Sequence, residues 1–177
     1  MKVSVFRQTK PLDEYLKKKL TAASTPGQRY LAYTTFAITR FQLLEHELRV
    51  YLLLLTNRRK LPISDHQLLN WPLKTLNDQF RKYGGDRVLV DRIGKLIPAR
   101  NFVAHEGFID AGEDFGLFTP SMIKVKLGRM ERIAADVEGM PYLVSQEAAK
   151  VMAASIHLRA KPIDEDDGAT TGHASIQ

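Results

Sequence analysis

The chain contains no cysteine, and this absence removes several classes of protein at once. Without a thiol it has neither a disulfide nor a thiolate metal site, so a disulfide-stabilised secreted scaffold is excluded. Long apolar runs are missing too: no stretch of about eighteen uncharged apolar residues occurs. The N-terminus lacks the continuous apolar segment of a signal peptide. We therefore expect a soluble, cytoplasmic protein without a membrane span.

The motifs of several enzyme classes are also absent. The chain has no Gly-x4-Gly-Lys phosphate loop, no dinucleotide-binding spacing of glycines and no Gly-x-Ser-x-Gly elbow. His46-Glu47 begins like a zinc-protease motif, but Val50 stands where the second histidine is required. We therefore expect neither a metal nor a cofactor.

Acidic residues are scarce in most of the chain and concentrated near its end. The whole sequence has 26 basic and 20 acidic residues, and residues 161–177 hold one lysine and four acidic residues, so positions 1–160 carry 25 against 16, or +9. We expect one domain over residues 1–160 and an acidic, disordered tail over 161–177. A basic domain favours polyanion partners such as RNA.

A long amphipathic helix is the main element that the pattern predicts. The pair Thr25-Pro26 is a typical helix start, and the helix should run from Gln28 to about Arg59. Apolar residues recur in it at alternating spacings of four and three, as in a bundle seam. These residues are Ala37, Phe41, Leu44, Leu48, Tyr51 and Leu55.

The end of this helix has a wider apolar surface than one seam requires, because Leu52, Leu53 and Leu54 follow one another. A helix packed on two sides has such a surface, for example against its own bundle and against a second subunit. A central helix in the core of a monomer would have it as well. The sequence leaves both interpretations open.

Shorter helices are expected around the long one. We expect an extended arm or edge strand over residues 1–11 and a helix over 12–20. Another helix should start after Trp71-Pro72 and stop at Gly84-Gly85. Asp86 should cap the next helix, which Pro98 should kink or restart, since proline lacks the backbone N–H.

Two structures are compatible with the segment after residue 110. Ile123, Val125 and Leu127 alternate with lysines, which favours a short β-hairpin near 115–127, but the same residues also permit a helix continuing to Val137. A last helix should be capped near Ser145. Its inward-facing residues should be Ala149, Met152 and Ile156.

The segment that carries the chemistry is Arg100-Asn101-Phe102-Val103-Ala104-His105. Arginine is a permanent planar donor that binds phosphate through two parallel hydrogen bonds. Histidine exchanges a proton near neutral pH. On a regular helix the two side chains differ by about 140° and rise by about 7.5 Å. One helix therefore cannot easily direct both at one phosphate, whereas two copies related by a twofold axis can.

The pattern Arg-Asn-x-x-Ala-His resembles the signature of the HEPN superfamily, and Gly107 and the long upstream helix agree with it. The resemblance implies an all-α, HEPN-like helical bundle with a long central helix. It also implies a metal-independent endoribonuclease of a toxin–antitoxin or phage-defence system, with RNA as substrate and a cognate antitoxin as a further partner. The active cleft of such proteins lies at a homodimer interface.

The resemblance also implies roles for individual residues. Arg100 would neutralise the phosphoryl oxygens, His105 would transfer the proton, and Asn101 would orient the histidine or donate a further hydrogen bond. A polar residue of the long helix supports the site in many HEPN proteins, and here Glu45 or Glu47 is the candidate. Toxins silenced by a nucleotidyltransferase have a tyrosine two places after the histidine, where this chain has Gly107. Control by modification at that position is therefore not expected.

Two other interpretations of the same residues stand beside catalysis. A non-catalytic HEPN-like dimer would bind RNA, a nucleotide or a protein through the same groove. A helical interaction protein would use its basic charge for solubility or assembly alone. In that case Arg100 pairs with a helix carboxylate, and His105 is a satisfied histidine near a helix end.

Overall fold

The regular structure is entirely helical in the residues that the computed structural model describes, namely 6–59, 68–107 and 119–159. The helices are α1 (Phe6–Ala22), α2 (Pro26–Arg59), α4 (Leu73–Lys82), α5 (Arg87–His105), α7 (Pro120–Glu138) and α8 (Met140–Arg159). The predicted all-α class is therefore confirmed. No helix in the described ranges is long and apolar enough to cross a membrane.

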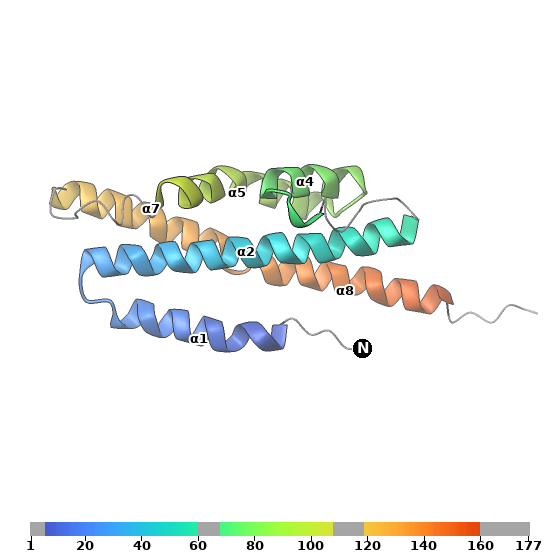
Figure 1. Ribbon diagram of the computed structural model, residues 1–177, viewed down its shortest axis with the longest axis horizontal. Helices are drawn as coiled ribbons and strands as arrows, with labels where there is room; N and C mark the ends of the chain where they lie inside the picture. Colours follow the sequence, from blue (N-terminus) through green and yellow to red (C-terminus); the bar gives the residue numbers. More distant parts are fainter. Residues whose placement is uncertain (1–5, 60–67, 108–118, 160–177) are drawn as a thin grey trace, which may run out of the picture.

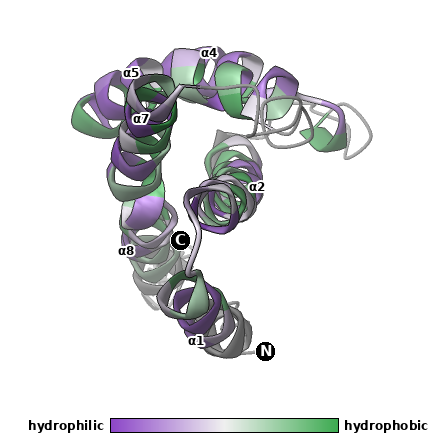
Figure 2. Cartoon of the chain, turned by 90° about the vertical axis from the view of Figure 1, so that its left-hand side faces the viewer, coloured by the Kyte–Doolittle hydropathy of each residue, from purple (hydrophilic) through white to green (hydrophobic). Residues whose placement is uncertain are grey.

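Helix α2 is the centre of the molecule, and the other helices lie around it (Figure 1). It packs most extensively on α8 and α7, and it also contacts α4, α5 and α1. Viewed along the long axis, α4, α5, α7, α8 and α1 form a curved row around α2 (Figure 2). The side of α2 opposite α7 and α8 carries no described helix in that view.

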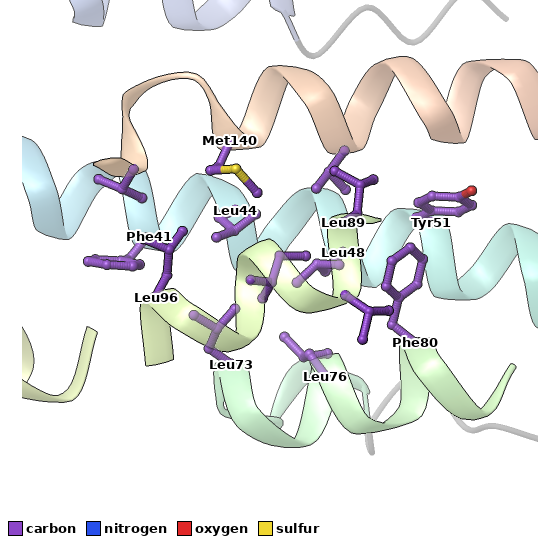
Figure 3. Packing of buried hydrophobic residues seen from close by; sticks show 14 of the residues in the cluster. Phe41, Leu44, Leu48, Tyr51, Leu73, Leu76, Phe80, Leu89, Leu96 and Met140 are labelled. Atoms are coloured by element: carbon purple, nitrogen blue, oxygen red, sulfur yellow. The ribbon is translucent and has the colours of Figure 1, made fainter. Parts of the chain in front are cut away.

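The core forms where the predicted seam of α2 meets the other helices. All six seam residues, from Ala37 to Leu55, are buried. Leu73, Leu76 and Phe80 of α4 pack on this seam from one side, together with Leu89 and Leu96 of α5 (Figure 3). The rings of Tyr51 and Phe80 meet edge to face, with centroids 4.8 Å apart. Burying each such side chain contributes about 1.5–3 kcal/mol, so this seam fixes α4 and α5 on α2.

Local signals set the helix ends. The Thr25 hydroxyl accepts a hydrogen bond from the Gln28 amide at 3.2 Å, and Gln28 Oε1 accepts from the Thr25 amide at 3.3 Å. This reciprocal arrangement is a capping box. Asp86 caps α5 as predicted, because its carboxylate accepts from the Leu89 amide at 2.9 Å.

The turn between α4 and α5 depends on two glycines. Gly84 has a φ of 76°, a conformation that L side chains rarely adopt. A Cβ on Gly85 would lie 2.4 Å from the Phe80 ring. The close approach of this turn to Phe80 therefore requires glycine, and it determines where α5 starts.

The predicted hairpin near 115–127 is wrong over residues 120–127, where the chain forms the first turns of α7. Ile123 and Leu127 are partly buried and Met130 is buried, so the helical spacing of these three residues prevailed over the alternation. Thr119 caps the helix, its hydroxyl accepting from the Met122 amide at 3.4 Å, and proline follows at the first helical position. Residues 115–118 lie outside the described part.

Three other expectations need correction. The extended arm over residues 1–11 is wrong from Phe6 onward, because α1 begins there and includes Pro11 as its sixth residue. Residues 1–5 lie outside the described part. Of the two effects expected of Pro98, a kink or a restart of the helix, the restart is wrong, since α5 is continuous from Arg87 to His105. Buried residues on both sides of Pro98, among them Leu96 and Phe102, hold the two halves in place.

The last helix also differs from the expectation, because α8 begins at Met140, five residues before Ser145. Its inward-facing stripe is therefore Met140, Val144 and Ala148, all buried. Ala149 and Met152 are exposed. The Ile156 side chain and the predicted acidic tail lie outside the described residues.

Candidate Arg/His site between α2 and α5

Arg100 lies in the C-terminal half of α5 and faces α2. Its Nε donates to Glu45 Oε1 at 3.0 Å, across 55 positions of sequence. The Arg100 side chain is 26% exposed and the Glu45 side chain 11%. The arginine is thus held at a defined place and still reaches the surface.

Glu45 also contacts a second arginine. Arg49, one turn further along α2, places its Nη2 3.5 Å from Glu45 Oε2. Arg49 in turn donates from Nε to the Leu68 carbonyl at 2.9 Å and from Nη2 to the Trp71 carbonyl at 3.1 Å. The carboxylate of Glu45 therefore lies between two guanidinium groups, and the segment leading into α4 is tied to the same cluster.

A small hollow lies beside the Glu45–Arg100 pair. Its volume is about 230 Å³, and its lining is Ile38, Phe41, Gln42, Glu45, Arg100, Val103 and Ala104. Sites that enclose a whole small molecule are typically about 300–1,000 Å³. The hollow is thus large enough for one chemical group, such as a phosphate, with Arg100 and Gln42 as polar neighbours.

His105 and Asn101 do not face this hollow in the way Arg100 does. Both are exposed, and on the continuous helix His105 is rotated by about 140° from Arg100. No hydrogen bond or ion pair to another described residue involves the side chain of His105 or Asn101. Gly107, just beyond the helix, is buried against Thr34 of α2, whose Cγ2 would lie 3.0 Å from an added Cβ.

The two candidate supporting glutamates differ in their surroundings. Glu45 contacts Arg100, whereas Glu47 is directed to α8, where the Ser145 side chain hydrogen-bonds to it. Burial raises the pKa of Glu47 above its ordinary value, and the charge of His46 and the Ser145 hydrogen bond act in the opposite direction. The structure thus brings Glu45 to the predicted site, but not Glu47.

Sequence reasoning missed two residues of this cluster. Gln42 stands three positions before Glu45 and Arg49 four positions after it, the spacings at which helix side chains become neighbours. This spacing was a usable signal once Glu45 was a candidate. The packing of α5 on α2 is not visible in the sequence.

The cluster fits more than one chemistry. An arginine held by a carboxylate beside a hollow suits anion binding, and it also suits a structural ion pair. In the described ranges no three histidine, aspartate or glutamate side chains are grouped so as to hold a metal ion. No family model, no curated protein and no solved structure matches this chain. The resemblance to HEPN proteins therefore stays a prediction from the sequence.

Proposed function

We propose that the chain is a metal-independent endoribonuclease of the HEPN type, acting in the cytoplasm in a toxin–antitoxin or phage-defence role. The observation that carries the proposal is the Glu45–Arg100 pair at 3.0 Å beside a hollow of about 230 Å³, on the helix that ends at an exposed His105. Because Arg100 is held through its Nε, the N–H groups on its two Nη atoms can donate to an anion.

Glu45 acts as the positioning residue in this proposal. It engages Nε of Arg100, and the two Nη groups make no hydrogen bond to another described residue. A guanidinium loses less conformational freedom on binding phosphate when it is already oriented. The same carboxylate also weakens the net positive charge at the site, so phosphate must compete with it.

His105 and Arg100 then have different roles in the reaction: His105 transfers protons, and Arg100 stabilises negative charge. A neutral imidazole takes the proton of an RNA 2′-hydroxyl, whose oxygen attacks the adjacent phosphorus. The bond from phosphorus to the 5′-oxygen breaks, and an imidazolium from the other subunit protonates this leaving oxygen. Arg100 stabilises the charge on the phosphoryl oxygens, and Asn101 orients the imidazole or donates to the phosphate. The products are a 2′,3′-cyclic phosphate and a 5′-hydroxyl.

Two copies of the chain assemble the complete site. The angle of about 140° between Arg100 and His105 prevents one copy from directing both at one phosphate. The side of α2 opposite α7 and α8 carries no described helix (Figure 2). Val50 and Leu53 are partly exposed apolar residues of α2, and on a regular helix they are turned by about 140° and about 160° from Leu55 of the buried seam. Pairing of this face around a twofold axis would place two hollows near each other. A cognate antitoxin would then act by covering the paired sites.

A second candidate function is a non-catalytic dimer that binds RNA, a nucleotide or a protein partner. The observation that favours it is the pairing of Arg100 with Glu45, and of Glu45 with Arg49. An arginine already partly neutralised suits reversible binding as well as catalysis.

The test is cleavage of structured and unstructured RNA by purified protein in EDTA. We expect His105→Ala and Arg100→Ala to lose at least about 100-fold in rate, the lower range for loss of a proton-transfer group. Glu45→Gln should lose less, because it only misplaces Arg100. The matched control is His46→Ala, which removes another exposed histidine outside the motif.

The results of this cleavage test distinguish the two candidate functions. The ribonuclease proposal is supported if His105→Ala folds normally but no longer cleaves RNA, and if the products of the wild-type protein carry cyclic-phosphate ends. Binding without cleavage, retained in His105→Ala and weakened in Arg100→Ala, supports the non-catalytic dimer. Equal cleavage by wild type and His105→Ala would overturn the site assignment.

A further inference from the structure

Arg129 of α7 is held beside the Arg-x4-His segment by an aromatic ring. Its guanidinium carbon lies 3.5 Å from the centroid of the Phe102 ring. Phe102 is buried between the helices, at 7% exposure, while Arg129 is exposed. A guanidinium stacked on a ring keeps its N–H edges available to other partners. The stacking therefore presents a cation at the surface next to α5.

Helix geometry brings a second cation of α7 close to His105. The C-terminal end of α5 and the N-terminal half of α7 run in opposite directions side by side (Figure 1). From the Phe102–Arg129 contact, His105 lies three residues along α5 and Lys126 three residues back along α7. Both steps rise by about 4.5 Å in the same direction. Lys126 and His105 therefore stand at the same height along the two helices.

The N-terminal half of α7 lies at the margin of the core, where the partly buried Leu127 packs against it. No residue from Pro120 to Arg129 is buried, and Met130 is the first that is. Figure 1 shows this half extending past the end of α5 and the start of α2. Residues 119–132 contain one acidic residue, Glu131, and four basic ones. The basic residues are Lys124, Lys126, Arg129 and Arg132.

Two of the three acidic residues of α7 pair with basic residues of other helices. Glu131 pairs with Arg29 of α2 at 3.0 Å, and Glu138 pairs with Lys17 of α1 at 3.5 Å. Among the described residues, no ion pair engages Arg129. Glu131 and Glu138 thus pair with α2 and α1, whereas Lys124, Lys126 and Arg129 lie in the projecting half, which contains no acidic residue.

We propose that Lys126 and Arg129 bind the phosphate backbone of an RNA strand on either side of the reacting phosphate. The strand then crosses the outer face of α5 and α7 at His105, and Arg129 is a positioning residue for substrate. This inference rests on the proposed RNA substrate. It adds a binding surface that the Arg-x4-His segment does not contain.

The experiment measures binding of a fluorescein-labelled single-stranded RNA of about 20 nucleotides to full-length protein at several salt concentrations. All proteins carry His105→Ala, so that the RNA stays intact. Arg129→Gln and Lys126→Gln should each weaken binding about two- to fivefold, the effect of one exposed charge pair. Each should also reduce the salt slope by about 0.7, the value for one phosphate contact on a single strand.

Two comparisons make the test specific. Arg129→Lys keeps the charge without the planar stack and should retain the salt slope with somewhat weaker affinity. Arg81→Gln removes an exposed cation near the end of α4. Arg81 precedes the first residue of α5, which is about 27 Å from His105 along the axis of α5. Arg81→Gln should leave affinity nearly unchanged.

Each possible result supports or contradicts the proposed RNA-binding surface. The proposed RNA-binding surface is wrong if Arg129→Gln and Arg81→Gln lose affinity equally, or if neither loses affinity. It is also wrong if the protein does not bind RNA. Binding that depends on Arg129, together with an RNA that wild type never cleaves, supports the surface while the ribonuclease proposal fails. Cleavage with a KM unaffected by Arg129→Gln leaves the ribonuclease proposal standing and removes this inference.

Discussion

Glu45 and Glu47 stand two positions apart on α2 and have opposite electrostatic surroundings. Glu45 lies between two cations, with Arg100 Nε 3.0 Å and Arg49 Nη2 3.5 Å from its carboxylate oxygens. Glu47 is buried toward α8 with Ser145 as its hydrogen-bond partner, and burial raises its pKa. Glu45 is therefore paired with two arginines, while Glu47 is a source of pH-dependent stability.

We expect Glu47→Gln to stabilise the protein at neutral and alkaline pH. The pKa of Glu47 is raised in the folded state, so its favourable contribution is present below the unfolded pKa and is lost as pH rises through the folded pKa. Glutamine resembles the protonated acid and still accepts from Ser145. Urea unfolding of both proteins at pH 5 and pH 8 measures the effect. A smaller gain at pH 8 than at pH 5 would contradict the assignment.

At the level of single residues, the sequence predicts the candidate site only in part. Arg100, Asn101 and His105 belong to one six-residue motif, so a local pattern can name them directly. The choice between Glu45 and Glu47 depends on which side of α2 meets α5, and Arg129 depends on how α7 passes Phe102. Such choices follow from packing between distant segments, which no local pattern contains.

Among the secondary-structure elements, the α4–α5 turn has the strictest steric requirement. Gly85 is so close to Phe80 that an added Cβ would overlap the ring at 2.4 Å, and Gly139 between α7 and α8 has nothing within 4 Å of such a Cβ. The two helix junctions therefore tolerate side chains very differently.

We predict that Gly85→Ala lowers the free energy of unfolding by about 1–3 kcal/mol, because Phe80 must move out of its packed position. Gly139→Ala is the matched control. It has a φ of −87°, which alanine adopts without strain, and should change stability by less than about 1 kcal/mol in the stabilising direction. Urea denaturation compares both with wild type. Similar values for the two variants would be inconsistent with the contact at Phe80.

Strong periodicity predicted elements better than weak alternation did. The seam of α2 extends over many turns, and its start and its six buried positions agree with the prediction. The segment 120–127 satisfies a strand and a helix equally by pattern, and it became a helix because Thr119 caps it and Met130 continues the apolar face into the core. The start of α8 was missed because the chain turns at Gly139 without a capping side chain.

For the whole molecule, the open side of α2 predicts its assembly state. If two copies pair through this face, replacing the partly exposed Leu53 by glutamate should produce a monomer, since like charges would meet across the twofold axis. Val88→Glu is the control, an exposed apolar residue of α5, 65% accessible. Sedimentation velocity at micromolar concentration checks the result. A wild type that sediments as a monomer would remove the dimeric site from the proposed mechanism.

The central position of α2 has a consequence for how the molecule opens. Every other described helix packs on α2, and the contacts among the remaining helices are fewer. Detaching α1 or α4 exposes only part of α2, whereas freeing its middle turns requires the departure of several helices. The amide protons of those turns should therefore exchange with solvent only through near-global unfolding, and those of α1 through local fraying.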